Sequence, residues 1–294
     1  MVTAVITTHR REPELVARAL NSILSQTYRD IKIIIVDDSP SDYERRDEVK
    51  QLAENSGANV RYIRHERCSG ACAARNTGLK AASGEFIGYL DDDDEWLPTK
   101  IEKQLQGFTS ESIGFVYCRY RMLASDESEV KSNRSGMESG YIFNKLLFKN
   151  IVGSTSFPLI RKSALDEIGG FDTELPSSQD LDVWMRLSRD HEANYIDEAL
   201  GIYHYHDGEQ ITTNPKKKIA GMERIIEKNL PDLQAEKKAY SCRLLALANY
   251  YALDKRLPTA FRKWLKAVSL NPSAVGTNLR SLLVSIKWRI VYAG

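Results

Sequence analysis

An apolar run leads directly into four consecutive aspartates in the stretch Phe86-Ile87-Gly88-Tyr89-Leu90-Asp91-Asp92-Asp93-Asp94. The run is short, aromatic and partly β-branched, which predicts a buried strand. Carboxylates crowded at a strand end repel one another, and a divalent cation is the obvious candidate to offset that repulsion. Mg²⁺ binds one or two carboxylates and keeps its other positions for water and phosphates. The alternative is a solvated acidic loop whose Asp91 or Asp94 caps the helix expected near Pro98.

The region before the aspartates alternates between strand and helix patterns. Strands are predicted at 2–7, 31–36 and 60–64, and helices at 13–24, 42–56 and 71–82. This alternation predicts the α/β class, with a mainly parallel sheet covered by helices on both faces. Ligands bind beyond the carboxyl ends of the strands in such sheets. The residues that end the first, second and fourth strands are therefore candidate site residues.

The pattern changes after the aspartates, and again near residue 214. Helices are predicted at 98–108, 143–149, 162–168 and 181–189, and extended segments at 113–120, 155–160, 195–196 and 200–205. Residues 125–140 are expected to form an exposed loop. Beyond Asn214-Pro215 only helical patterns occur, at 216–229, 233–253, 258–270 and 273–291.

We therefore predict two domains, residues 1–214 and an all-helical region at 215–294. Residues 248–272 resemble one tetratricopeptide helix pair. A single such unit cannot bury its own apolar face. It must pack on the main domain, on a partner or on a membrane.

The composition of the 294-residue chain, with 42% hydrophobic and 28% charged residues, fits a soluble globular protein. The 41 basic and 40 acidic residues give no overall charge that favours nucleic acid. No apolar stretch of about 18 residues predicts a membrane span, and Met1–Ile6 enters a strand without a signal-peptide pattern. The cysteines lack paired metal-ligand spacing, and Cys68 with Cys72 is only a weak zinc signal. A cytoplasmic protein with reduced thiols is expected.

Several motifs follow one another in a fixed order from residue 4 to about residue 206: Ala4–Thr7, Leu20–Tyr28, Ile35–Ser39, Ala73–Gly78, Gly84–Pro98 and Gly169–Arg186. Each motif is weak alone, but together they resemble the family 2 glycosyltransferases of the GT-A fold. The resemblance implies transfer of a sugar, with inversion, from a nucleotide diphosphate such as a UDP-sugar. The implied acceptor is a hydroxyl of a glycan or lipid-linked molecule in bacterial surface polysaccharide synthesis.

Sugar transfer places negative charge on the departing diphosphate, and a cation held by carboxylates can neutralise it. The resemblance implies that Asp91 and Asp93 hold Mg²⁺ or Mn²⁺ in an Asp-x-Asp motif. Asp92 is expected near the ribose, the metal or its waters. Asp94 falls outside the motif and is expected to cap or orient.

The nucleotide is expected at the strand ends. The resemblance assigns Asp38 to the ring N–H of the base, Thr7 to further base contacts and Arg75 to the diphosphate. Alternatively, Asp37 and Asp38 form a turn with Ser39-Pro40, and Arg75 makes a structural ion pair. The sequence Thr7-Thr8-His9-Arg10 departs from the family's Pro-Thr-Tyr-Asn, which leaves the base-binding loop undefined.

The acceptor hydroxyl must lose a proton to a base within hydrogen-bond reach. The resemblance points to Asp180, and Gln179 replaces the glutamate that often precedes this residue in the family. The alternative is that Asp180 only caps the following helix. Further candidates for substrate contact are Trp96, Ser154, Gln179 and His206; Trp96 can instead belong to the core, and His206 can instead be a strand-edge or loop residue.

Rival interpretations come from other classes. A nucleotidyltransferase should show a glycine-rich loop after the first strand, and Thr7–Arg11 contains no glycine. A non-catalytic module binding a partner through its helical tail, and a retaining transferase, stay open. Apolar and basic residues interleave at 280–291, which predicts either peripheral contact with the inner face of the cytoplasmic membrane or packing on the catalytic domain.

Overall fold

The computed structural model describes residues 1–124, 126–132, 136–205 and 214–272. The chain divides into two compact units. Unit 1 comprises Met1–Phe143, Ile151–Thr173 and Val183–Asp207, and unit 2 comprises Asn144–Asn150, Glu174–Asp182 and Gly208–Gly294. Unit 2 thus includes two segments that precede residue 214. The domain boundary at residue 214 stays a prediction.

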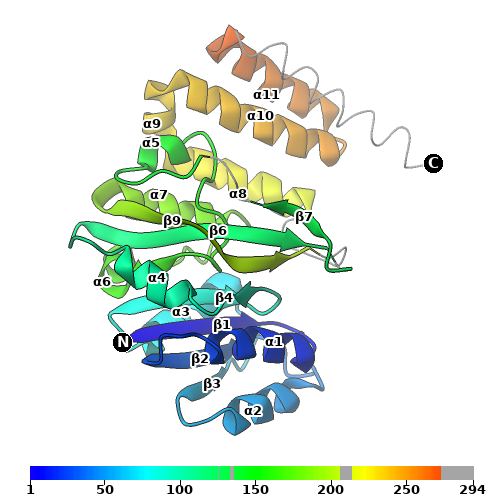
Figure 1. The fold of residues 1–294 in the computed structure, drawn as a ribbon. Helices are drawn as coiled ribbons and strands as arrows, with labels where there is room; N and C mark the ends of the chain where they lie inside the picture. Colours follow the sequence, from blue (N-terminus) through cyan, green and yellow to red (C-terminus); the bar gives the residue numbers. More distant parts are fainter. Residues whose placement is uncertain (125, 133–135, 206–213, 273–294) are drawn as a thin grey trace. The chain divides into compact units, whose positions relative to one another are not determined.

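The described part of unit 1 is built on a nine-stranded sheet with the order β3-β2-β1-β4-β8-β6-β9-β5, and β7 pairs with β6 (Figure 1). The strands are β1 (Val2–Thr8), β2 (Ile31–Asp37), β3 (Val60–Arg64), β4 (Phe86–Asp91), β5 (Glu95–Trp96), β6 (Ile113–Leu123), β7 (Glu129–Ser132), β8 (Leu159–Arg161) and β9 (Glu192–His204). Strands β1 to β4 are parallel, as are β6 and β9. Strand β8 runs antiparallel to β4 and β6. The mainly parallel α/β fold is confirmed.

Five helices in the described part of unit 1 connect the strands of this sheet along the chain. They are α1 (Pro13–Leu24), α2 (Arg46–Asn55), α3 (Ala71–Ala81), α4 (Lys100–Gln106) and α6 (Lys162–Glu167). Helix α1 buries Val16, Leu20 and Ile23 in the core at helical spacing. Helix α3 approaches β1 closely because Gly78 has no side chain, since a Cβ there would lie 2.4 Å from Cγ1 of Val5.

The sheet register aligns the strand ends that matter for the site. Thr7 on β1 pairs with Val36 on β2 and with Asp91 on β4. The parallel arrangement therefore places the ends of β1, β2 and β4 at one edge of the sheet. The loops after these strands carry the residues that the sequence singled out.

Two local predictions were wrong. The expected loop at 125–140 contains β7, which pairs antiparallel with β6. The two late strands are one strand, β9, whose pairing with β6 shifts register between Cys118 and Arg119. Residues Asp197 and Glu198 lie in that irregularity, and their charges interrupt the apolar pattern, so the sequence suggested a break there.

Unit 2 is helical in its described part. Helices α5 (Phe143–Leu146) and α7 (Gln179–Asp190) each have residues in both units, and α8 (Pro215–Lys228), α9 (Leu230–Ala235), α10 (Lys237–Leu253) and α11 (Leu257–Leu270) follow. The predicted helix at 233–253 is interrupted at Glu236, whose carboxylate accepts from the Lys238 N–H at 3.3 Å. The predicted helix at 273–291 lies outside the described residues.

Arg243 on α10 shows how the tail helices are held in unit 2. Its side chain is buried and donates to the carbonyl oxygens of Leu146 and of Leu147, the latter at 2.9 Å. Burial lowers the pKa of Arg243 to about 10. Helix α10 therefore packs on an earlier segment of the same chain. Among the described residues, no helix is long and apolar enough to cross a bilayer.

Candidate functional site

The four aspartates at the end of β4 alternate between partly exposed and buried. The side chains of Asp91 and Asp93 are 29% and 18% exposed, whereas Asp92 and Asp94 are 5% and 0% exposed. A turn closed by the Asp94 N–H and the Asp91 carbonyl, 3.1 Å apart, sets this alternation. Asp91 and Asp93 are therefore the carboxylates of the cluster that reach solvent.

Arginines supply positive charge to this cluster. Arg11 donates to Asp92 and to Asp93, each at 2.8 Å, and Arg75 donates to Asp91 at 2.7 Å. The sequence alone suggested that a metal offsets the repulsion between these carboxylates. In the structure, the two arginine side chains offset part of that repulsion. Arg11 was missed, although its position just after the first strand places it at the same sheet edge.

The pKa values of the two buried acids differ from ordinary aspartate. Burial raises the pKa of Asp92 to about 6, although the Arg11 charge acts in the opposite direction. Burial and the charges of Asp91 and Asp93 raise the pKa of Asp94 well above its ordinary value. Asp94 also contacts the Ser156 hydroxyl at 2.5 Å. Asp94 is therefore an interior residue. This placement agrees with its position outside the Asp-x-Asp motif of Asp91 and Asp93.

Residues 154–156 support the cluster from a separate loop. The Ser154 hydroxyl lies 3.3 Å from Oδ2 of Asp91, and the Ser156 hydroxyl accepts from the Asp91 N–H at 3.1 Å. The structure thus brings the candidate Ser154 to Asp91. Trp96 is 2% exposed and donates its indole N–H to the Ser156 carbonyl at 2.6 Å. This placement favours a core role for Trp96 over a sugar platform.

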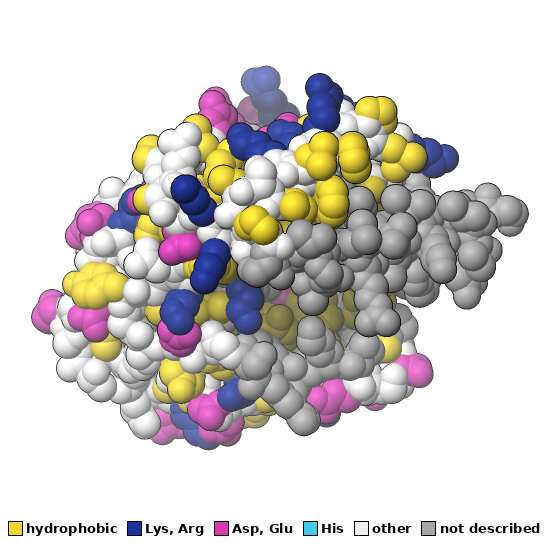
Figure 2. Space-filling model, turned by 90° about the horizontal axis from the view of Figure 1, so that it is seen from above, with side chains coloured by type: hydrophobic (Ala, Val, Ile, Leu, Met, Phe, Trp, Pro, Cys, Tyr) yellow, Lys and Arg dark blue, Asp and Glu magenta, His cyan; other side chains and the backbone are white. Residues whose placement is uncertain are grey.

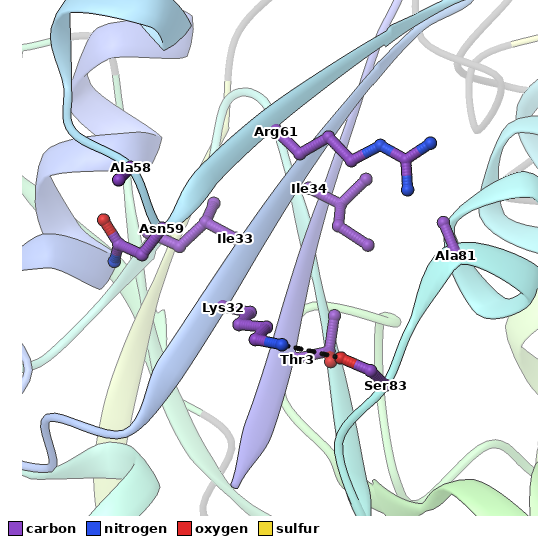
Figure 3. Close-up of a pocket in the computed structure, with 9 residues that line it drawn as sticks. All are labelled: Thr3, Lys32, Ile33, Ile34, Ala58, Asn59, Arg61, Ala81 and Ser83. Atoms are coloured by element: carbon purple, nitrogen blue, oxygen red, sulfur yellow. Dashed lines mark hydrogen bonds between the residues drawn. The ribbon is translucent and has the colours of Figure 1, made fainter.

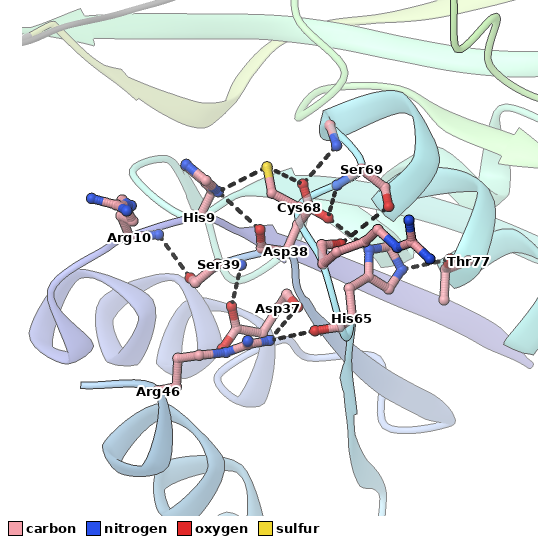
Figure 4. Close-up of polar contacts among 12 residues, drawn as sticks. His9, Arg10, Asp37, Asp38, Ser39, Arg46, His65, Cys68, Ser69 and Thr77 are labelled. Carbon is pink, nitrogen blue, oxygen red and sulfur yellow. Dashed lines mark hydrogen bonds and ion pairs between the residues drawn. The ribbon is translucent and has the colours of Figure 1, made fainter. Parts of the chain in front are cut away.

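Asp38, just after β2, is held by a set of hydrogen-bond donors (Figure 4). Its carboxylate accepts from the backbone N–H groups of Ser69 and Gly70 and from the His65 ring, each at 2.7 Å. Burial raises the pKa of Asp38, but the hydrogen bonds outweigh it and the pKa is lowered overall. Asp38 is therefore ionised. His65 was missed by the sequence analysis.

The neighbouring Asp37 has a different environment. It is 1% exposed, accepts from the Tyr62 hydroxyl at 2.6 Å and pairs with buried Arg46 at 3.3 Å. Asp37 therefore ties β2 to β3 and α2. Of the two acids, Asp38 is the one whose carboxylate faces the loop before α3, and it is itself 3% exposed.

Asp180 belongs to unit 2 and lies in the first turn of α7. Its Oδ2 accepts from the Asn150 side-chain amide at 2.8 Å. Gln179 donates to the Leu175 carbonyl at 2.9 Å. Asp182 is buried and forms an ion pair with Lys228, which indicates a structural role. Asn150 was missed, since only the fold brings it to the helix.

The remaining candidates fall into two groups. Thr7 lies on β1 at the register position of Asp91, and Arg75 makes the ion pair that the sequence analysis gave as the structural alternative. His206 lies outside the described residues.

A cavity of about 550 Å³ lies away from the carboxyl ends of the strands (Figure 3). Its lining includes Thr3, Lys32 and Arg61, from the early part of β1, β2 and β3. Thr3 pairs with Ile87, which is four residues before Asp91 on β4, a separation of about 13 Å along an extended strand. This cavity is therefore separate from the acidic cluster.

Comparisons with known proteins agree with one another. The family model of glycosyl transferase family 2 matches residues 3–169. The chain is 33% identical over 215 residues to the putative colanic acid biosynthesis glycosyl transferase WcaA of Escherichia coli K12, covering 69% of this chain and 73% of that protein. It is 28% identical over 196 residues to the Escherichia coli UDP-Glc:alpha-D-GlcNAc-diphosphoundecaprenol beta-1,3-glucosyltransferase WfgD, covering 67% and 73%.

A solved structure shows the same fold. The mannosyltransferase PcManGT of Pyrobaculum calidifontis, in complex with GDP-Man and Mn²⁺, gives a TM-score of 0.63 at 17% identity. The similarity covers 99% of this chain and 87% of that one. At this identity the likeness concerns the GT-A fold alone.

Proposed function

The chain belongs to glycosyl transferase family 2, and on that premise we propose that it transfers a sugar, with inversion, from a UDP-sugar to an acceptor hydroxyl. One observation carries the proposal. Ionised Asp38 follows β2, and the solvent-reaching pair Asp91 and Asp93 lies at the end of β4; β1 lies between these two parallel strands, and all three end at one edge of the sheet. Ligands bind at such edges in α/β folds.

The donor set at Asp91 and Asp93 fits a hard divalent cation. Both side chains offer carboxylate oxygens, the ligands that Mg²⁺ and Mn²⁺ prefer, and both reach solvent. A bound cation supplies positive charge that neutralises the departing diphosphate. Arg11 and Arg75 hold these carboxylates in place and keep their charge compensated before the donor arrives.

The base of the donor is proposed to bind at Asp38. An ionised carboxylate accepts the ring N–H of uracil, and bases without that donor would leave it unpaired. Thr7 on the neighbouring strand offers its backbone and hydroxyl to the same base. Asp92 is proposed to lie on the ribose side of the site, where it pairs with Arg11, which also pairs with Asp93. The UDP donor named for the relative WfgD supports a uridine nucleotide.

Asp180 is proposed as the base that takes the acceptor proton. The Asn150 amide fixes one of its oxygens and thereby orients the carboxylate. A single base without a covalent intermediate gives inversion at the anomeric carbon. Gln179 and Ser154 are proposed to position the sugars by hydrogen bonds, and Ser154 already contacts Asp91.

The acceptor is proposed to be a glycan or lipid-linked intermediate of bacterial surface polysaccharide synthesis, at the inner face of the cytoplasmic membrane. The names of WcaA and WfgD support this class. Helix α11 exposes the apolar side chains Leu257, Phe261 and Leu265. Its sequence contains basic residues and no acid. Apolar and basic side chains lie together on the face shown in Figure 2. Such a surface suits an anionic bilayer.

A donor assay with paired variants tests the proposal. The wild type is screened for hydrolysis or transfer from nucleotide sugars with Mn²⁺. We expect turnover of a UDP-sugar that is lost in Asp180→Asn, while donor affinity is retained. Asp190→Asn, an exposed acid on the same helix, is the matched control and should stay active. Turnover that survives in Asp180→Asn would exclude the assigned base, and an inactive wild type with every donor would favour a non-catalytic binding module.

A further inference from the structure

Three side chains with different metal-binding chemistry meet near the end of β2 (Figure 4). His9 lies in the loop after β1, Asp38 follows β2, and Cys68 lies in the loop before α3. One ligand atom from each of them lies within 4.8 Å of the other two. His9 and Cys68 are exposed, so solvent ions can reach the group.

The separations of these atoms fit one small cation. The Cys68 sulfur lies 3.8 Å from Nδ1 of His9 and 3.4 Å from Oδ2 of Asp38. In tetrahedral zinc with ordinary Zn–S, Zn–N and Zn–O bonds, neighbouring ligand atoms are about 3.3 to 3.7 Å apart. The two separations from the sulfur are close to these values, and the third pair lies within 4.8 Å, so side-chain adjustments bring the three atoms to one metal.

We propose that His9, Asp38 and Cys68 form a binding site for a thiophilic divalent cation, with Zn²⁺ as the best fit. Sulfur and imidazole ligands select zinc over magnesium, which separates this site from the oxygen-only pair Asp91 and Asp93. Three protein ligands leave one tetrahedral position for water. On binding, the Cys68 thiol releases its proton to solvent and its thiolate binds the metal.

The surroundings of Asp38 prepare the site for a metal. His65 and the N–H groups of Ser69 and Gly70 fix its carboxylate. Hydrogen bonds of this kind orient metal ligands and support affinity. Nδ1 of His9 lies 3.0 Å from the Asp38 carbonyl, and the Cys68 thiol contacts the Asp38 carboxylate. A metal would replace these weaker contacts.

Zinc at this position would occupy an oxygen of Asp38 and exclude a nucleotide base from it. This consequence rests on the proposed function, whereas the metal site itself does not. The site would then make donor binding sensitive to zinc, independently of the Mg²⁺ or Mn²⁺ that the reaction uses.

The test uses the reduced, metal-free full chain. Zn²⁺ affinity is measured by calorimetry, and Co²⁺ is added as a spectroscopic probe, since cobalt bound by thiolate gives a charge-transfer band. We expect binding near one ion per chain, with affinity reduced at least about tenfold in His9→Gln and in Cys68→Ser. The cobalt band should disappear in Cys68→Ser and persist in Cys242→Ser, which removes another exposed cysteine.

The outcomes separate the two proposals. Equal zinc affinity in wild type, His9→Gln and Cys68→Ser, or a cobalt band that Cys242→Ser abolishes, would overturn the metal site. The substituted side chains are exposed, and unchanged thermal unfolding would show that the variants fold. Zinc that binds as expected without weakening UDP binding would leave the metal site standing and contradict the placement of the base at Asp38.

Discussion

Replacing Asp92 by Asn should stabilise the protein at neutral pH and leave it nearly unchanged in acid. Asp92 is 5% exposed, and burial raises its pKa from 3.8 to about 6. A buried acid with a raised pKa binds its proton more tightly in the folded state, so stability is lost as the pH rises through this range. The shift corresponds to about 3 kcal/mol in the free energy of unfolding above pH 6.

The Asn variant removes this pH-dependent cost because its side chain is neutral and nearly isosteric. The lost attraction to Arg11 is already part of the Asp92 shift. We expect the variant to exceed the wild type by up to about 3 kcal/mol at about pH 7.5, and by close to zero at about pH 4.

Urea unfolding in EDTA, followed by tryptophan fluorescence at both pH values, measures the difference. Asp190→Asn, an exposed acid, is the control and should show little change at either pH. A difference between wild type and Asp92→Asn that does not depend on pH would refute the reasoning. So would a variant that is less stable than the wild type at the higher pH.

Three further predictions concern neighbouring features. Arg11→Gln removes the side chain whose positive charge bridges Asp92 and Asp93. The substitution should lower the free energy of unfolding by about 2 kcal/mol in the absence of metal. Mn²⁺ should raise the melting temperature of this variant more than that of the wild type, and equal shifts in the two proteins would contradict the prediction. Gly78→Ala places a methyl group against Val5; chemical unfolding should show a loss of about 1–3 kcal/mol, and an unchanged midpoint would count against the close contact of α3 with β1. Burial lowers the pKa of Lys100 to about 8, so between that pH and about 10.5 the unfolded state binds more protons than the folded state. The free energy of unfolding of the wild type, relative to that of Lys100→Met, should therefore rise as the pH rises through this range. A difference between the two proteins that does not change with pH would contradict the prediction.

The sequence predicted the parts of the fold that depend on local patterns. Short apolar runs predicted β1, β2 and β4, because these strands are buried at nearly every position and read as continuous apolar sequence. Strand β3 is only partly buried and was predicted from its place in the alternation of strands and helices. The aspartates after β4 were recognised for the same reason, since four acids directly after such a run are unusual.

The contacts that join distant segments could not be predicted in this way. Arg11 reaches Asp92 and Asp93 across about 80 residues of sequence, and Asn150 reaches Asp180 only through the fold. Cys68 and His9 are 59 positions apart, and neither belongs to a spaced metal motif. Such pairs depend on strand order and loop path, which residue spacing does not encode.

The most direct test of the account is the affinity of UDP, measured by calorimetry with and without Mn²⁺, for the wild type and Asp93→Asn. Asp93 is a solvent-reaching carboxylate of the proposed metal pair. The account predicts that Mn²⁺ strengthens UDP binding to the wild type and has little effect on the variant, with both proteins folded. Equal enhancement in both, or UDP binding that ignores Mn²⁺ altogether, would contradict it.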